Sequence, residues 1–278
     1  MKIGDVVGRK SYGKDVLFKI EGISEKGEVE ISGIKNRIKV KSDIRDLENI
    51  KYGEIKEFRR KFESEVEESI SRVKRDTAEV YKERNVAVGK VLHIDGDEEY
   101  LRMCMKHYRE LEIPAVGARV EEKDQGRIIR VLLEKYMPDI VIVTGHDSLR
   151  DKKREKEIES YRSSGYYVEA VREARRVNPS KDSLVIIAGG CQSHYEGLIE
   201  AGANFASSPS RILIHAVDVV LMAAKIAYTS IEDVIRVDEI VGYTITGEEG
   251  IGGFETRGTL RKGNKKNFHK TVDKEVMT

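Results

Sequence analysis

The chain has 278 residues, of which 39% are hydrophobic and 36% are charged. This length favours one large or two unequal domains, and a charged share above the usual 25% or so is typical of a soluble protein with long exposed helices. The 50 Lys and Arg residues against 49 Asp and Glu residues leave a net charge of +1. Bulk electrostatic attraction is thereby excluded, so we expect neither nucleic acid nor a membrane as a partner.

Targeting signals and cysteine frameworks are missing from the sequence. No run reaches the roughly 18 apolar residues of a membrane span, and the first residues lack the apolar stretch of a signal peptide. We therefore expect a cytoplasmic protein. Cys104 and Cys191 are too few for a disulfide scaffold or a cysteine-based zinc site, so each must be judged from its surroundings.

The first third of the chain changes pattern near residue 52. Residues 1–52 alternate apolar and polar side chains in short runs at 15–20, 28–31 and 37–40, which are separated by glycines. This pattern predicts a small β-barrel or curled sheet that serves as a folding or docking appendage. From 54 to 84, apolar residues recur every three or four positions among dense charges, which predicts an amphipathic helix connecting two domains.

Beyond Asn85, strand-like apolar runs alternate with helical segments. The rhythm predicts an α/β domain over 86–256, with a parallel sheet covered on both faces, followed by a basic, flexible tail over 257–278. The predicted strands are 88–94, 115–120, 139–144 and 184–188, and the predicted helices are 98–111, 126–136 and 168–177. Such sheets carry their chemistry at the carboxyl ends of the strands. The residues just after each apolar run are therefore the candidate site residues.

A cysteine follows the last of these strands, within residues 189–194. The two glycines before Cys191 permit a sharp turn, and a helix is predicted over 193–201, so we expect Cys191 at a helix N-terminus. There the helix dipole and free backbone N–H groups favour the nucleophilic thiolate, and the same N–H groups suit the oxyanion of a tetrahedral intermediate. The alternative is a buried structural cysteine.

His146 follows another of these strands and is the candidate general acid and base. Alone it could be an imidazole that caps an element or closes the edge of the core. Paired with Cys191, it favours nucleophilic catalysis in which His146 protonates the leaving amine and then activates water. His194 is the rival imidazole, but it belongs to the following predicted helix and is expected to turn away. His93 and Cys104 are interpreted as structural.

Metal chemistry is the main alternative from the residues themselves. Asp95 and Asp97 follow the first strand of the predicted sheet and could together hold a divalent ion, as in a metal-dependent transferase or phosphohydrolase. No His-x-x-x-His or Cys-x-x-Cys pair appears, and the glycines at 250–253 lack the lysine spacing of a phosphate loop. We therefore expect no cofactor and no metal.

Several long blocks of the sequence carry a resemblance to a known family. The blocks are 6–12, 89–97, 138–147, 188–194, 201–211 and 253–258. Together they resemble the YabG family, the sporulation-specific proteases of spore-forming Firmicutes, nearly from end to end. The resemblance implies a cysteine endopeptidase that processes precursor proteins of the spore coat and cortex and cuts after arginine. It also implies that Cys191 and His146 form the catalytic dyad.

The same resemblance implies where the protein acts and what else it could cut. We expect it in the cytoplasm of the sporulating cell, with association with the spore coat. An arginine preference makes Arg257, Arg261 and the basic residues of the 54–84 helix candidate self-cleavage sites. A noncatalytic assembly protein that binds coat proteins through the barrel and helix remains the alternative.

A more distant similarity is to the caspase-like cysteine peptidases, in which one strand ends in the histidine and the next in the cysteine. Those enzymes usually have glycine directly after the histidine, whereas Asp147 stands there in this chain. The Cys191 N–H is thus the one assigned oxyanion donor. By analogy Asp95, Asp97 or Asp147 could bind a substrate guanidinium, with bidentate geometry favouring arginine, although each could equally cap a helix.

Overall fold

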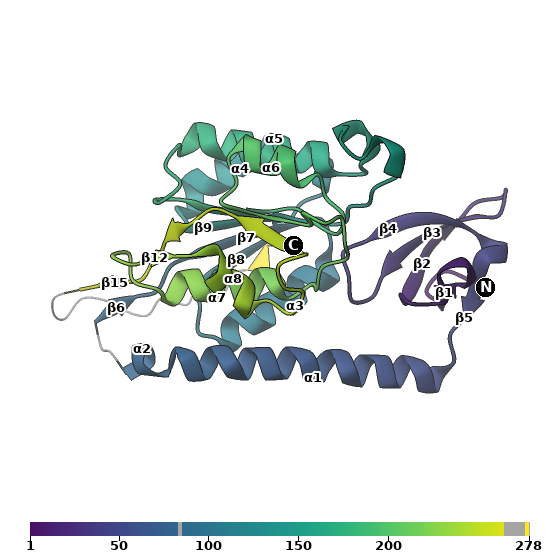
Figure 1. Cartoon of the computed structure of the whole chain (residues 1–278), viewed down its shortest axis with the longest axis horizontal. Coiled ribbons are helices and arrows are strands. Elements are labelled where there is room, and N and C mark those ends of the chain that lie inside the picture. Colours follow the sequence, from purple (N-terminus) through teal and green to yellow (C-terminus); the bar gives the residue numbers. More distant parts are fainter. Residues whose placement is uncertain (83–84, 264–275, 278) are drawn as a thin grey trace.

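The computed structural model describes residues 1–82, 85–263 and 276–277 of the chain. Figure 1 shows a small N-terminal sheet beside a larger body, in which helices cover both faces of a central sheet. One long helix leaves the small sheet and runs beneath the larger body. Within the described residues, no helix combines the length and the apolar character that a membrane span needs.

The N-terminal sheet has five antiparallel strands in the order β4-β3-β2-β1-β5. They are β1 (Val6–Arg9), β2 (Phe18–Ile23), β3 (Glu28–Gly33), β4 (Lys39–Asp43) and β5 (Leu47–Asn49). Phe18, Ile20, Val29 and Ile31 are buried, whereas Lys19 and Glu30, which alternate with them along the strands, are partly exposed, as expected for strands with one covered face. In this fully described segment β4 and β5 are the two ends of the strand order, so of the predicted barrel or curled sheet the structure has the sheet.

The predicted connecting helix consists of two pieces, α1 (Tyr52–Asp76) and α2 (Ala78–Lys82). Thr77 separates them, and its hydroxyl donates to the Val73 carbonyl over 2.8 Å. The buried stripe of α1 packs in the same core as α7 (Asp218–Tyr228). Residues 83–84, at the end of the predicted helix, lie outside the described residues.

The central sheet has seven strands in the order β13-β11-β10-β9-β7-β8-β16. They are β7 (Val91–Asp95), β8 (Ala115–Arg119), β9 (Ile140–Thr144), β10 (Val185–Ala188), β11 (Phe205–Ser207), β13 (Ile251–Gly253) and β16 (Val276–Met277). Every neighbouring pair is parallel except β11 with β13. The predicted parallel sheet is therefore confirmed, and its four predicted strands match β7 to β10 within a few residues.

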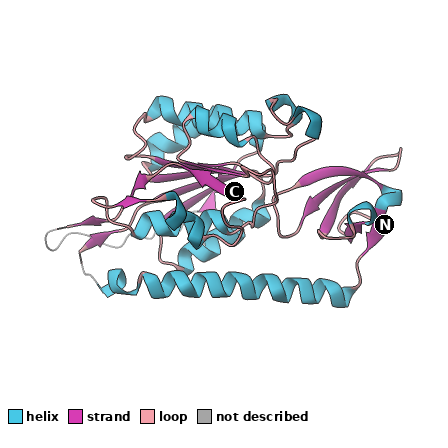
Figure 2. Cartoon of the chain, in the orientation of Figure 1, coloured by secondary structure: helices cyan, strands magenta, loops and turns pink. Residues whose placement is uncertain are grey.

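Helices cover the central sheet in two layers (Figure 2). One layer consists of α4 (Glu122–Tyr136), α5 (Ser164–Val177) and α6 (Tyr195–Ala201). The opposite layer consists of α3 (Glu98–Glu110), α7 and α8 (Val237–Tyr243), with α1 alongside. Because alternate residues of each strand enter one of two apolar cores, the strands read as continuous hydrophobic runs in the sequence.

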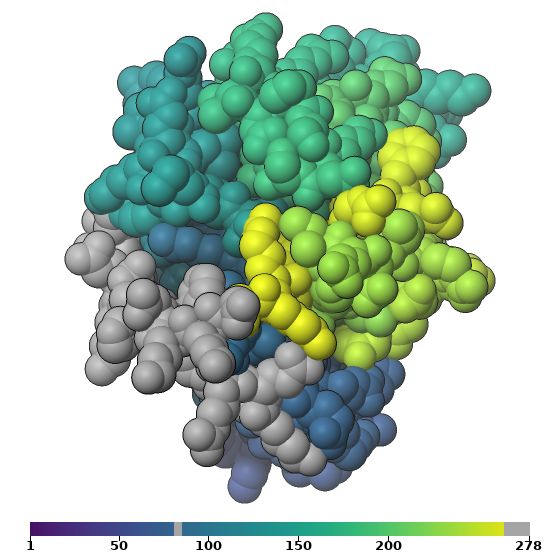
Figure 3. Space-filling view, turned by 90° about the vertical axis from the view of Figure 1, so that its left-hand side faces the viewer, coloured from purple at the N-terminus to yellow at the C-terminus, as the bar shows by residue number. Residues whose placement is uncertain are grey.

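The remaining elements are short. Two-residue strands pair as β12 (Val234–Ile235) with β14 (Thr256–Arg257), and as β6 (Val86–Ala87) with β15 (Arg261–Lys262). Single 3-10 turns form at Lys10–Tyr12, Ile44–Asp46, Lys152–Arg154 and Ile158–Ser160. Figure 3 shows the segment up to residue 263, in yellow, lying across the end of the molecule remote from the N-terminal sheet. Much of the predicted flexible tail, at 264–275 and 278, lies outside the described residues.

Candidate active site

The loops after β9 and β10 lie side by side at the carboxyl edge of the central sheet. The two strands are parallel neighbours and pair along their whole length. A Cβ on Gly190 would lie only 2.6 Å from the carbonyl oxygen of Gly145, so this close approach requires glycine. His146 and Cys191, which follow these two glycines, are therefore on adjoining segments of the chain.

Cys191 is fully buried beneath the N-terminal sheet. It packs in the same apolar cluster as Phe18 and Ile38, and its sulfur lies 3.4 Å from the backbone nitrogen of Ile214. Burial raises the pKa of the thiol to about 12, an effect that the backbone N–H groups of Ile214 and Arg37 only partly oppose. A thiol in this state is protonated at neutral pH and is a poor nucleophile.

The prediction that Cys191 lies at a helix N-terminus is wrong. The helix α6 begins at Tyr195, and His194 is its N-cap, so a turn separates the thiol from the helix. The field of a helix dipole is confined to its first turn, and it therefore does not lower the pKa of this cysteine. Ser193, which we expected inside the helix, instead donates its hydroxyl to the Asp147 carboxylate over 2.8 Å.

His146 faces the acidic loop after β7. Its ring meets that of Tyr100 edge-on, with 5.7 Å between the centroids, and its Nε2 lies 3.9 Å from a carboxylate oxygen of Asp97. Burial lowers the pKa of the imidazole, while the negative charges of Asp97 and Glu122 act in the opposite direction. His146 and Asp97 line a pocket of about 770 Å³ that Cys191 does not line. The imidazole thus borders this pocket, and the thiol does not.

The Asp147 carboxylate is fully engaged inside the protein. Its donors are the backbone N–H groups of Ser148 and Ser163 and the hydroxyls of Ser164 and Ser193. Burial nevertheless raises the pKa of this carboxyl to about 6. The bonds occupy the oxygens that a substrate guanidinium would need, so the carboxylate of Asp147 does not fit the substrate-binding role expected of it.

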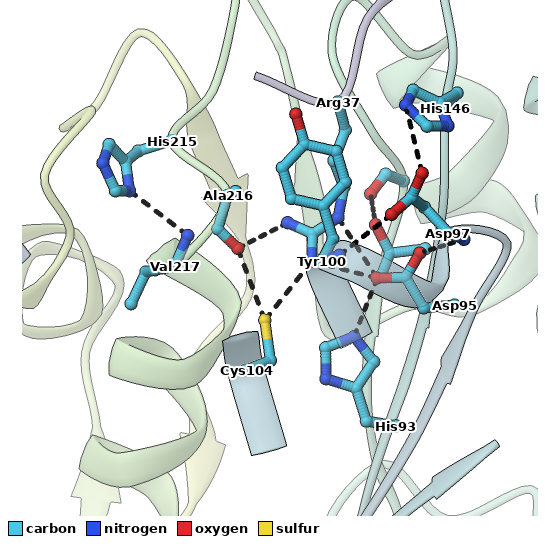
Figure 4. A network of polar contacts seen from close by, with 12 residues as sticks. Arg37, His93, Asp95, Asp97, Tyr100, Cys104, His146, His215, Ala216 and Val217 are labelled. Atoms are coloured by element: carbon cyan, nitrogen blue, oxygen red, sulfur yellow. Dashed lines mark hydrogen bonds and ion pairs between the residues drawn. The ribbon is translucent and has the colours of Figure 1, made fainter. Parts of the chain in front are cut away.

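Asp95, the last residue of β7, holds a guanidinium in the interior (Figure 4). Arg37 comes from the turn between β3 and β4, and its Nη2 lies 3.0 Å from a carboxylate oxygen of Asp95. Solvent reaches neither side chain. Burial by itself would raise the pKa of Asp95, but the charge of Arg37 and a contact with His93 hold it well below its usual range.

Other groups complete the enclosure of the Arg37 guanidinium. Its Nη1 donates to the carbonyl of Ala216, its Nη2 lies 3.4 Å from the sulfur of Cys104, and it lies 5.0 Å from the centroid of the Tyr100 ring. Figure 4 shows the guanidinium between Ala216 on one side and Asp95 on the other. Sequence reasoning missed Arg37 as a functional candidate, because it read the residue as part of a strand and its partners are remote in the chain.

Asp97 combines two of the roles that the sequence left open. Its carboxylate caps α3 by accepting the backbone N–H of Tyr100 over 2.9 Å. Its side chain is 27% exposed and borders the same pocket as His146. The Asp97 carboxylate can therefore cap α3 and still contact a substrate in the pocket.

The rival residues have structural partners. His194 accepts the backbone N–H of Gly197 through its Nδ1, which fixes it as the cap of α6. His93 and Cys104 are fully buried, and burial raises the pKa of the Cys104 thiol to about 11. Within the described ranges, no group of three or more His, Cys, Asp and Glu side chains could hold a metal ion. The carboxylate of Asp95, required by the metal alternative, is bound to Arg37 instead.

The fold and these residues define an α/β protein with a cysteine and a histidine on adjoining strand-end loops and a buried carboxylate that binds arginine. The family model described as YabG peptidase U57 matches residues 2–265. The sporulation-specific protease YabG of Bacillus subtilis (strain 168) is 42% identical over 281 residues, which cover 94% of this chain and 97% of that protein. The chain belongs to the YabG peptidase family, as the resemblance predicted. No solved structure matches it.

Proposed function

We propose that the chain is a cysteine endopeptidase of the sporulating cell that cuts precursor proteins of the spore coat and cortex after arginine. Membership of a family of sporulation-specific proteases supports the peptidase activity. The observation that carries the cysteine mechanism is the close approach of Gly190 to Gly145, because each glycine directly precedes one member of the dyad, Cys191 or His146.

The proposed reaction proceeds through a covalent intermediate. His146 takes the proton of the Cys191 thiol, and the resulting thiolate attacks the carbonyl carbon of the scissile bond. The oxyanion is stabilised by backbone N–H groups that include that of Cys191. His146 donates a proton to the leaving amine, which departs as the thioester forms. Water, deprotonated by His146, then hydrolyses the thioester and regenerates the thiol.

Selectivity for arginine is proposed to come from Asp95. A buried carboxylate beside a backbone carbonyl suits a guanidinium better than an ammonium, because several N–H donors in a fixed plane can be satisfied at once. Asp95 with the Ala216 carbonyl already satisfies a guanidinium in this way. Asp97 borders the neighbouring pocket, and we assign it a secondary contact with substrate.

The caspase-like relationship is part of the proposal. The histidine follows β9 and the cysteine follows the neighbouring strand β10, which is the strand order expected for that class. We place the activity in the cytoplasm of the sporulating cell, with a second location at the spore coat, where its substrates would be.

The test uses a recombinant reporter protein with one arginine in an exposed linker, incubated with purified variants. Cys191→Ala and His146→Ala are each expected to lower kcat/KM by at least about a thousandfold with the fold retained. Cys104→Ala is the comparison, because it removes the other fully buried cysteine. Its sulfur borders the Asp95 pocket and is not assigned to the dyad, so cleavage should persist, with any effect in KM rather than in kcat. A Cys191→Ala protein with wild-type activity would exclude the mechanism.

The complete burial of Cys191 is the one observation that favours the noncatalytic alternative, a protein that binds coat proteins. The two functions separate cleanly in the same assay. A noncatalytic protein would bind a coat precursor without shortening it, and Cys191→Ala would bind equally well. Retention of wild-type cleavage by a chelator-treated sample would count against the metal-dependent alternative.

A further inference from the structure

The loop between β3 and β4 leaves the N-terminal sheet and passes through the candidate active site. On one side, Lys35 accepts the backbone N–H of Ala216 over 3.3 Å, and the Asn36 amide donates to the carbonyl of Ile214 over 2.9 Å. On the other side, the carbonyl of Arg37 accepts the backbone N–H of Asp147 over 3.1 Å. The loop is therefore bonded on both edges, as a peptide strand added between two protein segments would be.

The side chain of Arg37 fills the only arginine-binding site that the described residues form around Asp95. Burying two opposite charges costs desolvation free energy, and their mutual attraction offsets that cost with little to spare. Stability of the fold therefore does not by itself explain why this ion pair is buried. A pocket suited to arginine is nevertheless useful to a peptidase that cuts after arginine. In this chain the pocket already contains an arginine of the same molecule.

The backbone of Arg37 lies between the two loops that carry the dyad. Its carbonyl oxygen accepts from the residue directly after His146, and its N–H is close enough to the Cys191 sulfur to affect the pKa of that thiol. A substrate carbonyl bound for attack needs a backbone N–H donor of this kind. The Asp147 N–H thus supplies the second donor that the sequence left unassigned.

The loop differs from an extended substrate in one respect. The backbone N–H of Ile38 donates to the carbonyl of Asn36 over 2.8 Å, which closes a three-residue turn centred on Arg37. Ile38 itself packs in the apolar cluster that contains Cys191. The turn therefore holds Arg37 in the pocket while Ile38 covers the thiol.

From these contacts we infer that the Ile34–Ile38 loop is an internal substrate mimic, which occupies the groove of the peptidase site and keeps Cys191 closed to protein substrates. This inference rests on the proposed function. The loop must leave before a substrate arginine can enter, and the thiol then becomes solvated. Because burial is the first cause of its raised pKa, solvation returns the thiol toward ordinary acidity and reactivity.

The first experiment measures how fast iodoacetamide alkylates Cys191 at pH 8, quantified by peptide mass spectrometry. Arg37→Ala is expected to speed the labelling at least about tenfold and to raise kcat/KM on the reporter. Arg45→Ala removes an exposed arginine from the 3-10 turn between β4 and β5, and it should change neither rate. Labelling of Arg37→Ala at the wild-type rate would overturn the inference.

Arg37→Ala leaves the buried carboxylate of Asp95 without its partner and could unfold the protein. A second variant therefore tests the same inference with the ion pair intact. Tyr100→Phe keeps the ion pair and removes a hydroxyl that lies 2.5 Å from the Gly33 carbonyl and 2.9 Å from that of Asn36. Loosening the loop in this way should speed the labelling of Cys191 several-fold. An unchanged rate in a folded Tyr100→Phe protein would contradict the role of the loop.

The second experiment needs no catalysis and is done in the Cys191→Ala background. N-acetyl-arginine amide should raise the Tm of Arg37→Ala, because the vacated pocket accepts its guanidinium, and should not raise that of the chain with Arg37 in place. N-acetyl-citrulline amide, uncharged but similar in shape, is the control ligand. If neither compound binds while Cys191→Ala abolishes cleavage, the inference fails and the proposed function stands. Binding of the arginine amide together with full activity of Cys191→Ala would exclude the cysteine mechanism, and with it the substrate-mimic role of the loop, and would leave Asp95 as an arginine-binding site only.

Discussion

Arg37 and Asp95, 58 positions apart in the chain, form an ion pair over 3.0 Å that is closed to solvent on all sides. The pair joins the N-terminal sheet to the carboxyl edge of the central sheet. Its two charges depend on each other, because neither has water to replace the missing partner. It is therefore a structural link between the two parts, and the proposed selectivity for arginine rests on it.

Asp95→Asn should destabilise the protein by about 3 to 5 kcal/mol, since it leaves a buried guanidinium without its counter-charge. Urea unfolding followed by circular dichroism measures the loss. Asp238→Asn, which removes one partner of a fully exposed ion pair, should leave the unfolding midpoint in place. Equal midpoints for the two variants would show that the buried pair contributes no more than a surface pair.

The close approach of the two strand-end loops predicts the effect of a single methyl group. Gly190→Ala would place its Cβ 2.6 Å from a backbone oxygen, which cannot rotate away as a side chain could. We expect a loss of about 1 to 3 kcal/mol from the strain, together with loss of cleavage as the loops separate. Gly53→Ala, in the first turn of α1 with open space around it, should instead gain up to about 1 kcal/mol.

Local patterns in the sequence predicted the regular elements of the larger domain well. Continuous apolar runs predict β7 to β10 because both faces of the sheet are covered. The rule that such sheets carry their chemistry at the carboxyl ends of the strands points to Asp95, His146 and Cys191. The start of α6 was predicted too early, because the residues over 193–201 have a helical pattern, whereas Ser193 precedes the helix and donates its hydroxyl to Asp147. The local sequence does not show a partner that lies 46 positions away.

The cover over the thiol could not be predicted in the same way. Cys191 is buried by Phe18 of the N-terminal sheet and by Ile38 of the loop between β3 and β4, among others. Contacts between residues so far apart in the chain leave no periodic pattern in a single sequence. The helix α7 was also missed, since it is apolar on nearly every side and has no amphipathic stripe. Arg37 was interpreted as one basic residue of the alternating strand pattern at 37–40, because its buried partner Asp95 lies 58 positions away in the sequence.

Self-cleavage is expected after Arg257 or Arg261 before any site in α1. Both residues lie in two-residue strands with side chains 46% exposed, whereas α1 is a continuous helix that must unwind before a peptidase can bind it as an extended chain. Intact mass spectrometry over a time course should show wild-type products that end at one of these two arginines. Identical masses for wild type and Cys191→Ala throughout the time course would remove the prediction.

The loss of folding stability in acid should depend strongly on His215. Its ring stacks on Phe62, with 4.7 Å between centroids, and burial, followed by the positive charges of Lys35 and Arg37, lowers the pKa of the imidazole to about 3. The unfolded chain binds this proton near the ordinary value of 6.5, so it takes up protons before the folded state does. Stability contributed by the neutral imidazole is therefore complete above pH 6.5 and is lost as the pH falls toward 3.

The loss that His215 causes across this range is on the order of 5 kcal/mol, from the separation of the two pKa values. His215→Phe keeps an aromatic ring against Phe62 and removes the titration, so its stability should fall less steeply between pH 6.5 and pH 4. Phe62→Leu is the comparison, because it weakens the packing and leaves the imidazole covered. It should lower the free energy of unfolding by a similar amount at each pH. If the free energy of unfolding fell equally steeply with pH in wild type and in His215→Phe, other groups would cause the loss of stability in acid. His93 and His146 are the candidates, because burial lowers their pKa values too.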